Sequence, residues 1–183
     1  MQNDRAQQLE RRKRSGLRTV SLVGYTNAGK SSLFNTLTGK HTLVENVLFA
    51  TLDSIAGKLY IPELKNEILV TDTIGFIRDL PPHLIRAFTS TLMESIHAEV
   101  LLHVIDASDP DVDSKIQVVS NILRDLGVSP QMVLYVFNKS DKTAPVQKKR
   151  LLEQYDSYRP VFVSATSGEG VSNVKQAVAD RLL

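Results

Sequence analysis

The stretch that decides the fold is Gly24-Tyr25-Thr26-Asn27-Ala28-Gly29-Lys30-Ser31, which stands between an apolar run and a helical pattern. It matches the phosphate-binding loop, whose glycines let backbone amides curl around phosphates while the following helix N-terminus adds partial positive charge. In such a loop Lys30 reaches the β- and γ-phosphates and the Ser31 hydroxyl binds magnesium. We also expect Ser32 to belong to the nucleotide site. A glycine-rich turn that only caps a helix is the alternative, and the strand–loop–helix context disfavours it.

Apolar strands alternate with amphipathic helices after this loop, which is the pattern of an α/β sheet. We expect strands at Thr19–Val23, Gly57–Ile61, Glu67–Thr71, Val100–Ile105, Met132–Phe137 and Val161–Val163. We expect helices at Gln2–Arg14, Lys30–Thr38, His83–His97, Asp111–Leu126, Ala144–Tyr155 and Val171–Leu183.

The arrangement of these elements follows from their composition and spacing. Val100–Ile105 is apolar apart from His103, too continuously so for a half-exposed strand, which suits a parallel strand covered on both faces. Only Pro62–Asn66 joins the second strand to the third, so that pair must be antiparallel. We therefore predict a three-layer α/β fold of the P-loop class, with a six-stranded, mostly parallel sheet, one antiparallel edge strand and helices on both faces.

Composition bounds the remaining possibilities. The 183 residues suit one domain, which we place at 17–183, preceded by a charged helical linker at 1–16. The chain has no cysteine, which excludes disulfides and thiolate chemistry. It has neither a secretory signal nor an apolar run of the about 20 residues that span a bilayer, so we expect a cytoplasmic monomer. The basic cluster Arg11–Arg14 is either a solvated helix face or an RNA contact.

A second motif selects the base. Asn138-Lys139-Ser140-Asp141 follows the apolar strand Met132–Phe137. The Asp141 carboxylate can accept hydrogen bonds from N1–H and the exocyclic amine of guanine, whereas adenine presents an unprotonated N1 there. We expect Asn138 to brace the loop and the Lys139 stem to cover the ring. GTP and GDP are the predicted ligands.

Weaker motifs complete the site. In Asp72-Thr73-Ile74-Gly75, the Asp72 carboxylate can reach magnesium through a water, and the Gly75 amide can meet the γ-phosphate. Ser164-Ala165-Thr166 can lay backbone amides along the guanine edge. A threonine between the first helix and the second strand must complete the magnesium coordination, and position alone does not separate Thr42 from Thr51.

Taken in order, these motifs resemble the Era, Obg and HflX class of GTPases, and longer strings resemble the HflX family in particular. These strings are residues 22–31, Phe49-Ala50-Thr51-Leu52-Asp53, residues 72–81 and residues 101–110. The resemblance implies that Thr51 is the magnesium-binding threonine and that residues 49–53 belong to the nucleotide site. It further implies binding to the large ribosomal subunit and its RNA, and a role in splitting or rescuing ribosomes. Family members carry further domains ahead of the GTPase domain.

Phe76 stands where Ras-like enzymes place the glutamine that orients the attacking water. We therefore expect slow hydrolysis by Lys30, Asn27, Thr51 and Gly75, completed by another group. One candidate is a potassium ion held by Asn27, as in related GTPases, and the other is a partner such as the ribosome. A GTP-operated binding module with little hydrolysis, acting through a non-ribosomal partner, is the alternative function. A P-loop ATPase or small-molecule kinase is disfavoured by Asn138–Asp141.

Overall fold

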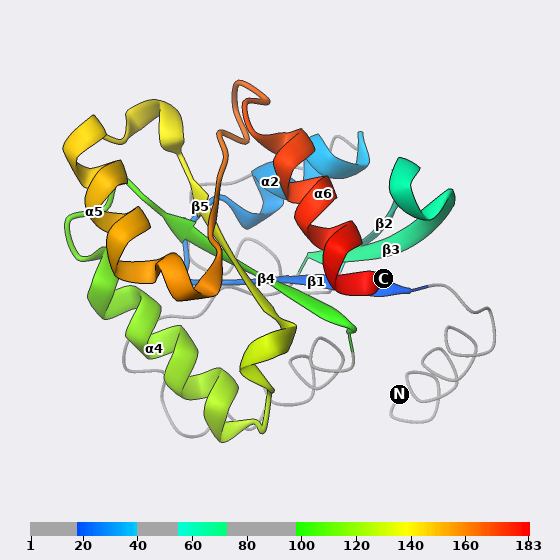
Figure 1. Ribbon diagram of the computed structural model, residues 1–183, viewed down its shortest axis with the longest axis horizontal. Coiled ribbons are helices and arrows are strands. Elements are labelled where there is room, and N and C mark those ends of the chain that lie inside the picture. Colours follow the sequence, from blue (N-terminus) through cyan, green and yellow to red (C-terminus); the bar gives the residue numbers. More distant parts are fainter. Residues whose placement is uncertain (1–17, 40–54, 73–97) are drawn as a thin grey trace.

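The computed structural model describes residues 18–39, 55–72 and 98–183 (Figure 1). The helices expected at Gln2–Arg14 and His83–His97 lie outside the described residues. So do the expected site residues Phe49–Asp53 and Thr73–Gly75, and so does Thr42.

Six strands form one sheet in the order β2-β3-β1-β4-β5-β6. Their bounds are β1 (Thr19–Val23), β2 (Ile55–Ile61), β3 (Asn66–Asp72), β4 (Val100–Asp106), β5 (Val133–Asn138) and β6 (Val161–Phe162). Every neighbouring pair is parallel except β2 and β3. That pair is antiparallel because only the short 3-10 turn η1 (Pro62–Leu64) and Lys65 connect it. The predicted mostly parallel sheet with one antiparallel edge strand is confirmed.

Four α-helices in the described part of the chain cover both faces of this sheet (Figure 1). α2 (Lys30–Thr38) and α6 (Val171–Leu182) pack on one face, with Phe34 and Val178 in a shared core. α4 (Val112–Asp125) and α5 (Pro145–Tyr155) pack on the other. No described helix is long and apolar enough to cross a membrane.

The spacing of apolar residues explains this packing. α4 buries Val112, Ile116, Val119 and Leu123, which form one stripe of a 3.6-residue helix. Along β4, alternate apolar residues enter the two cores: Leu102 faces α2 and α6, and Leu101 faces α4 and α5. A strand buried on both faces has no solvated side, which is why this stretch lacks an alternating pattern.

Three strands continue one residue beyond their predicted ends, onto Asp72, Asp106 and Asn138. Each of these polar residues still lies in the ladder, since Asp106 pairs with Asn138 and Asp72 pairs with Leu22. β5 also begins at Val133 rather than at Met132, because Pro130–Met132 forms a 3-10 turn. The extensions matter for function: they bring three polar side chains to the carboxyl edge of the parallel strands, where α/β sheets bind ligands.

Candidate nucleotide-binding site

The phosphate-binding loop joins β1 to α2 and contains two glycines, Gly24 and Gly29. Any other residue at either position would force neighbouring atoms to move. A Cβ on Gly24 would lie 2.2 Å from the carbonyl oxygen of Val104. Gly29 has φ 89°, and a Cβ there would lie 2.3 Å from Asn138 Nδ2. The loop therefore packs directly against β4 and against the end of β5, which fixes its position at the sheet edge.

Lys30 begins α2 and turns back over the loop. Its Nζ donates to the carbonyl oxygens of Tyr25 at 3.2 Å and Gly24 at 3.4 Å. Burial lowers the pKa of Lys30 to about 8, and the nearby Asp72 carboxylate partly opposes this shift. Such a cation is poorly hydrated, so a phosphate group placed beside it would gain a strong charge-assisted interaction.

The carboxamide of Asn138 ties the phosphate-binding loop to the loop after β6. Its Nδ2 donates to the Ala28 carbonyl at 2.9 Å, and its Oδ1 accepts from the Ala165 amide at 3.0 Å. Asn138 is 2% exposed, so both bonds are shielded from water. The bracing role predicted for Asn138 is seen directly. The Ala165 amide, expected along the guanine edge, is instead occupied by this bond.

Lys139 is held by a partner that the motif analysis did not assign. Its Nζ donates to Asp106 Oδ2 at 2.6 Å, while Asp106 Oδ1 accepts from the Ser108 amide at 3.0 Å and the Ser108 hydroxyl at 2.6 Å. Asp106 is the last residue of β4, directly beside Asn138 in the ladder. A carboxylate at the carboxyl end of a central strand was the one sequence signal that could have identified it.

Asp141 lies in the 3-10 turn η3 (Ser140–Lys142) and is exposed. A hydrogen bond with Ser164 is the main cause that lowers the pKa of Asp141, and Lys142 and Lys139 add to the effect. Ser164 is fully buried, and its hydroxyl also accepts from the Ser167 amide at 3.2 Å. The carboxylate is thus ionised at neutral pH and held from one side by the loop after β6.

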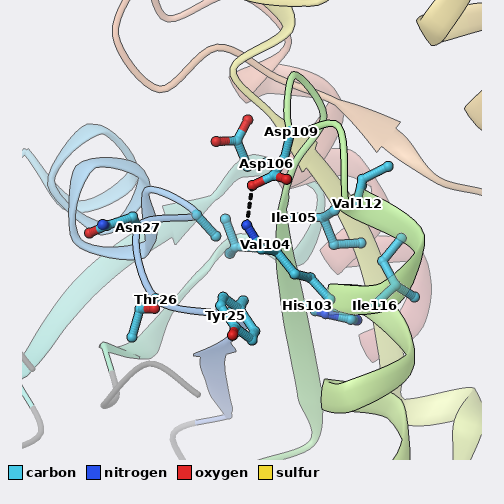
Figure 2. Close-up of a pocket in the computed structure, with 12 residues that line it drawn as sticks. Tyr25, Thr26, Asn27, His103, Val104, Ile105, Asp106, Asp109, Val112 and Ile116 are labelled. Carbon is cyan, nitrogen blue, oxygen red and sulfur yellow. Dashed lines mark hydrogen bonds and ion pairs between the residues drawn. The ribbon is translucent and has the colours of Figure 1, made fainter. Parts of the chain in front are cut away.

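A cavity of about 240 Å³ lies behind the phosphate-binding loop. Figure 2 shows Tyr25, Thr26 and Asn27 on one side of it and Val112 and Ile116 of α4 on the other. Lys115, which lines the cavity, pairs with Asp109 and lies 5.2 Å from the centre of the Tyr25 ring. Asp141 does not line this cavity, so it is not where the base would lie.

His103 is buried in the middle of β4. Its ring centre lies 5.1 Å from that of Tyr135. Burial, aided by Lys30, lowers the pKa of His103 to about 3. Its Nδ1 has no hydrogen-bond partner within the described ranges.

The predicted site residues that the structure describes come together at the carboxyl edge of the sheet. They are Gly24, Tyr25, Thr26, Asn27, Ala28, Gly29, Lys30, Ser31, Ser32, Asp72, Asn138, Lys139, Ser140, Asp141, Ser164, Ala165 and Thr166. Outside the described residues lie Phe49, Ala50, Thr51, Leu52, Asp53, Thr73, Ile74 and Gly75.

The residues present fit a magnesium ion. Ser31 offers a hydroxyl in the first turn of α2, and Asp72 is a carboxylate 1% exposed at the end of β3. These are the hard oxygen donors that magnesium prefers. In residues 18–39, 55–72 and 98–183 no group of three or more His, Cys, Asp and Glu side chains could hold a metal.

Comparison with known proteins agrees with this geometry. Residues 19–139 match the family described as 50S ribosome-binding GTPase. The whole chain is 44% identical to GTPase HflX of Caldanaerobacter subterraneus subsp. tengcongensis, of which it covers 41%. It is 41% identical to GTPase HflX of Methanocaldococcus jannaschii over 94% of this chain and 43% of that protein. The chain thus spans about two fifths of the length of these relatives.

Solved structures show the same fold. A GTP-binding protein from Sulfolobus solfataricus in complex with GDP superposes with a TM-score of 0.72 and 29% identity, covering 99% of this chain and 58% of that one. Era of Aquifex aeolicus, 23% identical over 90% of this chain and 56% of its own, has a TM-score of 0.74 and supports the fold alone. With a family match that spans β1 to Lys139, and HflX proteins among its relatives, this chain belongs to the 50S ribosome-binding GTPase family.

Proposed function

We propose that this chain binds GTP as its magnesium complex and hydrolyses it slowly to GDP, in a protein that acts on the large ribosomal subunit. The observation that carries the proposal is the Asn138 carboxamide, which joins the phosphate-binding loop to the loop after β6. Ser164 of that second loop lowers the pKa of Asp141, the residue proposed to bind the base. One ligand with phosphates at one end and a guanine at the other spans these two loops.

Base recognition rests on the charge state of Asp141. Its lowered pKa keeps the carboxylate ionised, so it can accept from both N1–H and the exocyclic amine of guanine. Adenine would present an acceptor to these oxygens, which disfavours ATP. Lys139, whose ammonium group is bonded to Asp106, would lay its stem over the ring.

Phosphate binding and magnesium binding use the other end of the site. Lys30 and the amides at the start of α2 bind the phosphates, and Ser31, Asp72 through a water, and Thr51 would hold the ion. When bound, magnesium neutralises charge that develops on the phosphates. Gly75 would donate its amide to the γ-phosphate.

Phe76 cannot orient a water, so an additional group must raise the rate. Asn27 is exposed on the phosphate-binding loop with φ 61°, where it could help to hold a potassium ion. The second source is the ribosome, which we propose as the dominant one because charge stabilisation supplied by a partner raises rates by about 10³- to 10⁵-fold. The description of the family and the name of the relatives support this partner. Arg11–Arg14 is the candidate RNA contact.

The test measures GTP hydrolysis in potassium and in sodium, each with and without purified large ribosomal subunits. We expect slow turnover alone and a large rise with subunits. Equal rates in all four conditions would defeat both sources of activation and favour the alternative, a GTP-operated binding module that acts through a non-ribosomal partner. Phe76 supports this alternative because its side chain cannot orient the attacking water.

Base specificity is tested separately by calorimetry with GDP, ADP and xanthosine diphosphate. Asp141→Asn should weaken GDP binding at least tenfold and shift preference toward the xanthine nucleotide, whose C2 carbonyl can accept from the new amide. Asp111→Asn, which changes another exposed aspartate outside the site, is the matched control. Equal affinity of the unmodified chain for ADP and GDP would exclude the proposed base site.

A further inference from the structure

Thr36 makes a long-range hydrogen bond that its position in a helix does not require. It is exposed in the second turn of α2, yet its Oγ1 lies 2.8 Å from the carbonyl oxygen of Ala165, 129 residues away in the chain. The same hydroxyl lies 3.0 Å from the Ser32 carbonyl, the local bond that threonine commonly makes in helices. Thr38, in the next turn, bonds only to the Phe34 carbonyl, at 2.8 Å, among its side-chain hydrogen bonds in the described structure.

The residue that Thr36 contacts is held from both sides. Its amide donates to Asn138 Oδ1 at 3.0 Å and its carbonyl accepts from Thr36. Ala165 is 8% exposed and belongs to the core under α2 and α6. A residue with both backbone groups bonded to side chains from two other elements has little freedom to rotate.

This constraint reaches the base-reading carboxylate through one residue. Ser164 precedes Ala165, is fully buried, and its hydroxyl lowers the pKa of Asp141. The loop on its other side is fixed as well, because the amide of Ser140, which precedes Asp141, donates to the Val163 carbonyl at 3.1 Å. A rotation of the Ala165 backbone would therefore move the Ser164 hydroxyl relative to Asp141. α2 lies beside the loop that leads into α6 (Figure 1), which is how a helix that begins at the phosphate-binding loop reaches this loop.

We propose that Thr36 is a positioning residue for guanine recognition: its hydroxyl holds Ala165, and through Ser164 it keeps Asp141 aimed at the exocyclic amine of the base. The inference rests on the proposed guanine binding. Under it, α2 serves both ends of the nucleotide, with its first turn at the phosphates and its second turn supporting the base loop.

The test compares GDP with inosine diphosphate, which lacks only the exocyclic amine, so the ratio of their affinities reports the bond from that amine to Asp141. Binding is measured by calorimetry for the unmodified chain and for Thr36→Val, Thr36→Ser and Thr38→Val. Thr36→Val should weaken GDP binding about threefold to tenfold, which is the usual contribution of one hydrogen bond. It should weaken binding of inosine diphosphate less, so the ratio of the two affinities should fall. Thr36→Ser keeps the hydroxyl and should restore the ratio. Thr38→Val removes a local helix bond and should change neither.

Two results would overturn the role of Thr36: an unchanged ratio in Thr36→Val, or an equal loss of both nucleotides together with a lowered melting temperature. Failure of the underlying guanine site looks different. The unmodified chain would then bind ADP as tightly as GDP, and the comparison of threonine variants would not be needed to see it.

Discussion

At the scale of single residues, Lys139 shows how the site is supported from outside the motif. Its backbone has φ 60°, a left-handed conformation that costs a residue with a side chain about 1–2 kcal/mol. The ion pair with Asp106, 2.6 Å long and largely shielded, holds the side chain in one direction from this conformation. Asp106 therefore offsets part of the strain and orients the side chain that would cover the base.

Asp106→Asn tests this support. The amide keeps an oxygen for Ser108 but loses the charge that holds Lys139, so we expect GDP binding to weaken about fivefold, the worth of a partly exposed ion pair. Calorimetry at low and high salt measures the loss, which should be smaller at high salt. Asp113→Asn removes a similar pairing, with Arg150 between α4 and α5 and outside the site, and should leave GDP affinity unchanged. Equal effects of the two variants would contradict the assignment.

The sequence motifs contain the predicted site residues that the structure brings to the carboxyl edge of the sheet, but not two residues outside the motifs that contact them. Lys30, Asn138 and Asp141 stand in short motifs whose spacing is set by one loop, so local pattern is sufficient. Asp106 and Thr36 act across 33 and 129 residues of sequence, and no spacing rule covers those separations. Their roles follow from strand register and helix packing, which the periodicity of one chain does not specify.

At the scale of elements, the turn from β1 into α2 depends on the space at Gly29. Gly29→Ala would place a Cβ 2.3 Å from Asn138 Nδ2 at φ 89°, so the variant must break the Asn138 bond to Ala28 or move the loop. We expect a loss of about 2–4 kcal/mol in the free energy of unfolding, from the strained backbone and the broken buried bond together. Urea unfolding measures it.

Gly127→Ala is the matched control for this clash. Gly127 also has positive φ, at 76°, but a Cβ there would meet nothing within 4 Å. The free energy of unfolding of Gly127→Ala should therefore fall by only about 1 kcal/mol, the cost of placing alanine at positive φ. If the two alanine variants were equally destabilised, contact with Asn138 would not be the reason for glycine at position 29.

Element types were predictable and strand ends were not. Apolar runs identified all six strands, yet Asp72, Asp106 and Asn138 were expected to follow their strands rather than end them. Polar side chains read as loop residues, but the backbone hydrogen bonds of a parallel ladder do not depend on the side chain. Strand order was likewise absent from the pattern, because periodicity shows which face is buried and not which strand lies beside it.

At the scale of the whole molecule, His103 makes stability depend on pH. It is neutral in the folded chain because burial lowers its pKa to about 3, whereas in the unfolded chain it titrates near 6.5. Below pH 6.5 the unfolded state therefore binds a proton that the folded state does not, so stability falls as the pH drops toward 3. From pH 7 to pH 5 this loss is roughly 2 kcal/mol.

Urea unfolding at pH 7 and pH 5 measures this loss, and His103→Leu should remove it. The chain has four histidines, and the other three remain in the variant, so the difference between the two slopes belongs to His103. The pKa values of Asp109 and Asp113 are lowered in the folded chain, so the stability that these groups contribute is lost only below the pH at which aspartates usually titrate. They therefore do not affect the difference between pH 7 and pH 5. An unchanged slope in the variant would show that His103 is protonated in the folded chain.

Because the Asn138 carboxamide bonds to both the phosphate-binding loop and the loop after β6, these two loops hold each other in place. Under the proposed function, a guanine nucleoside would contact one of these loops and pyrophosphate the other. Joining them would then add an effective-concentration advantage with little ordering cost. Small guanine fragments extended stepwise toward the phosphates are accordingly a rational starting point for inhibitors of this chain.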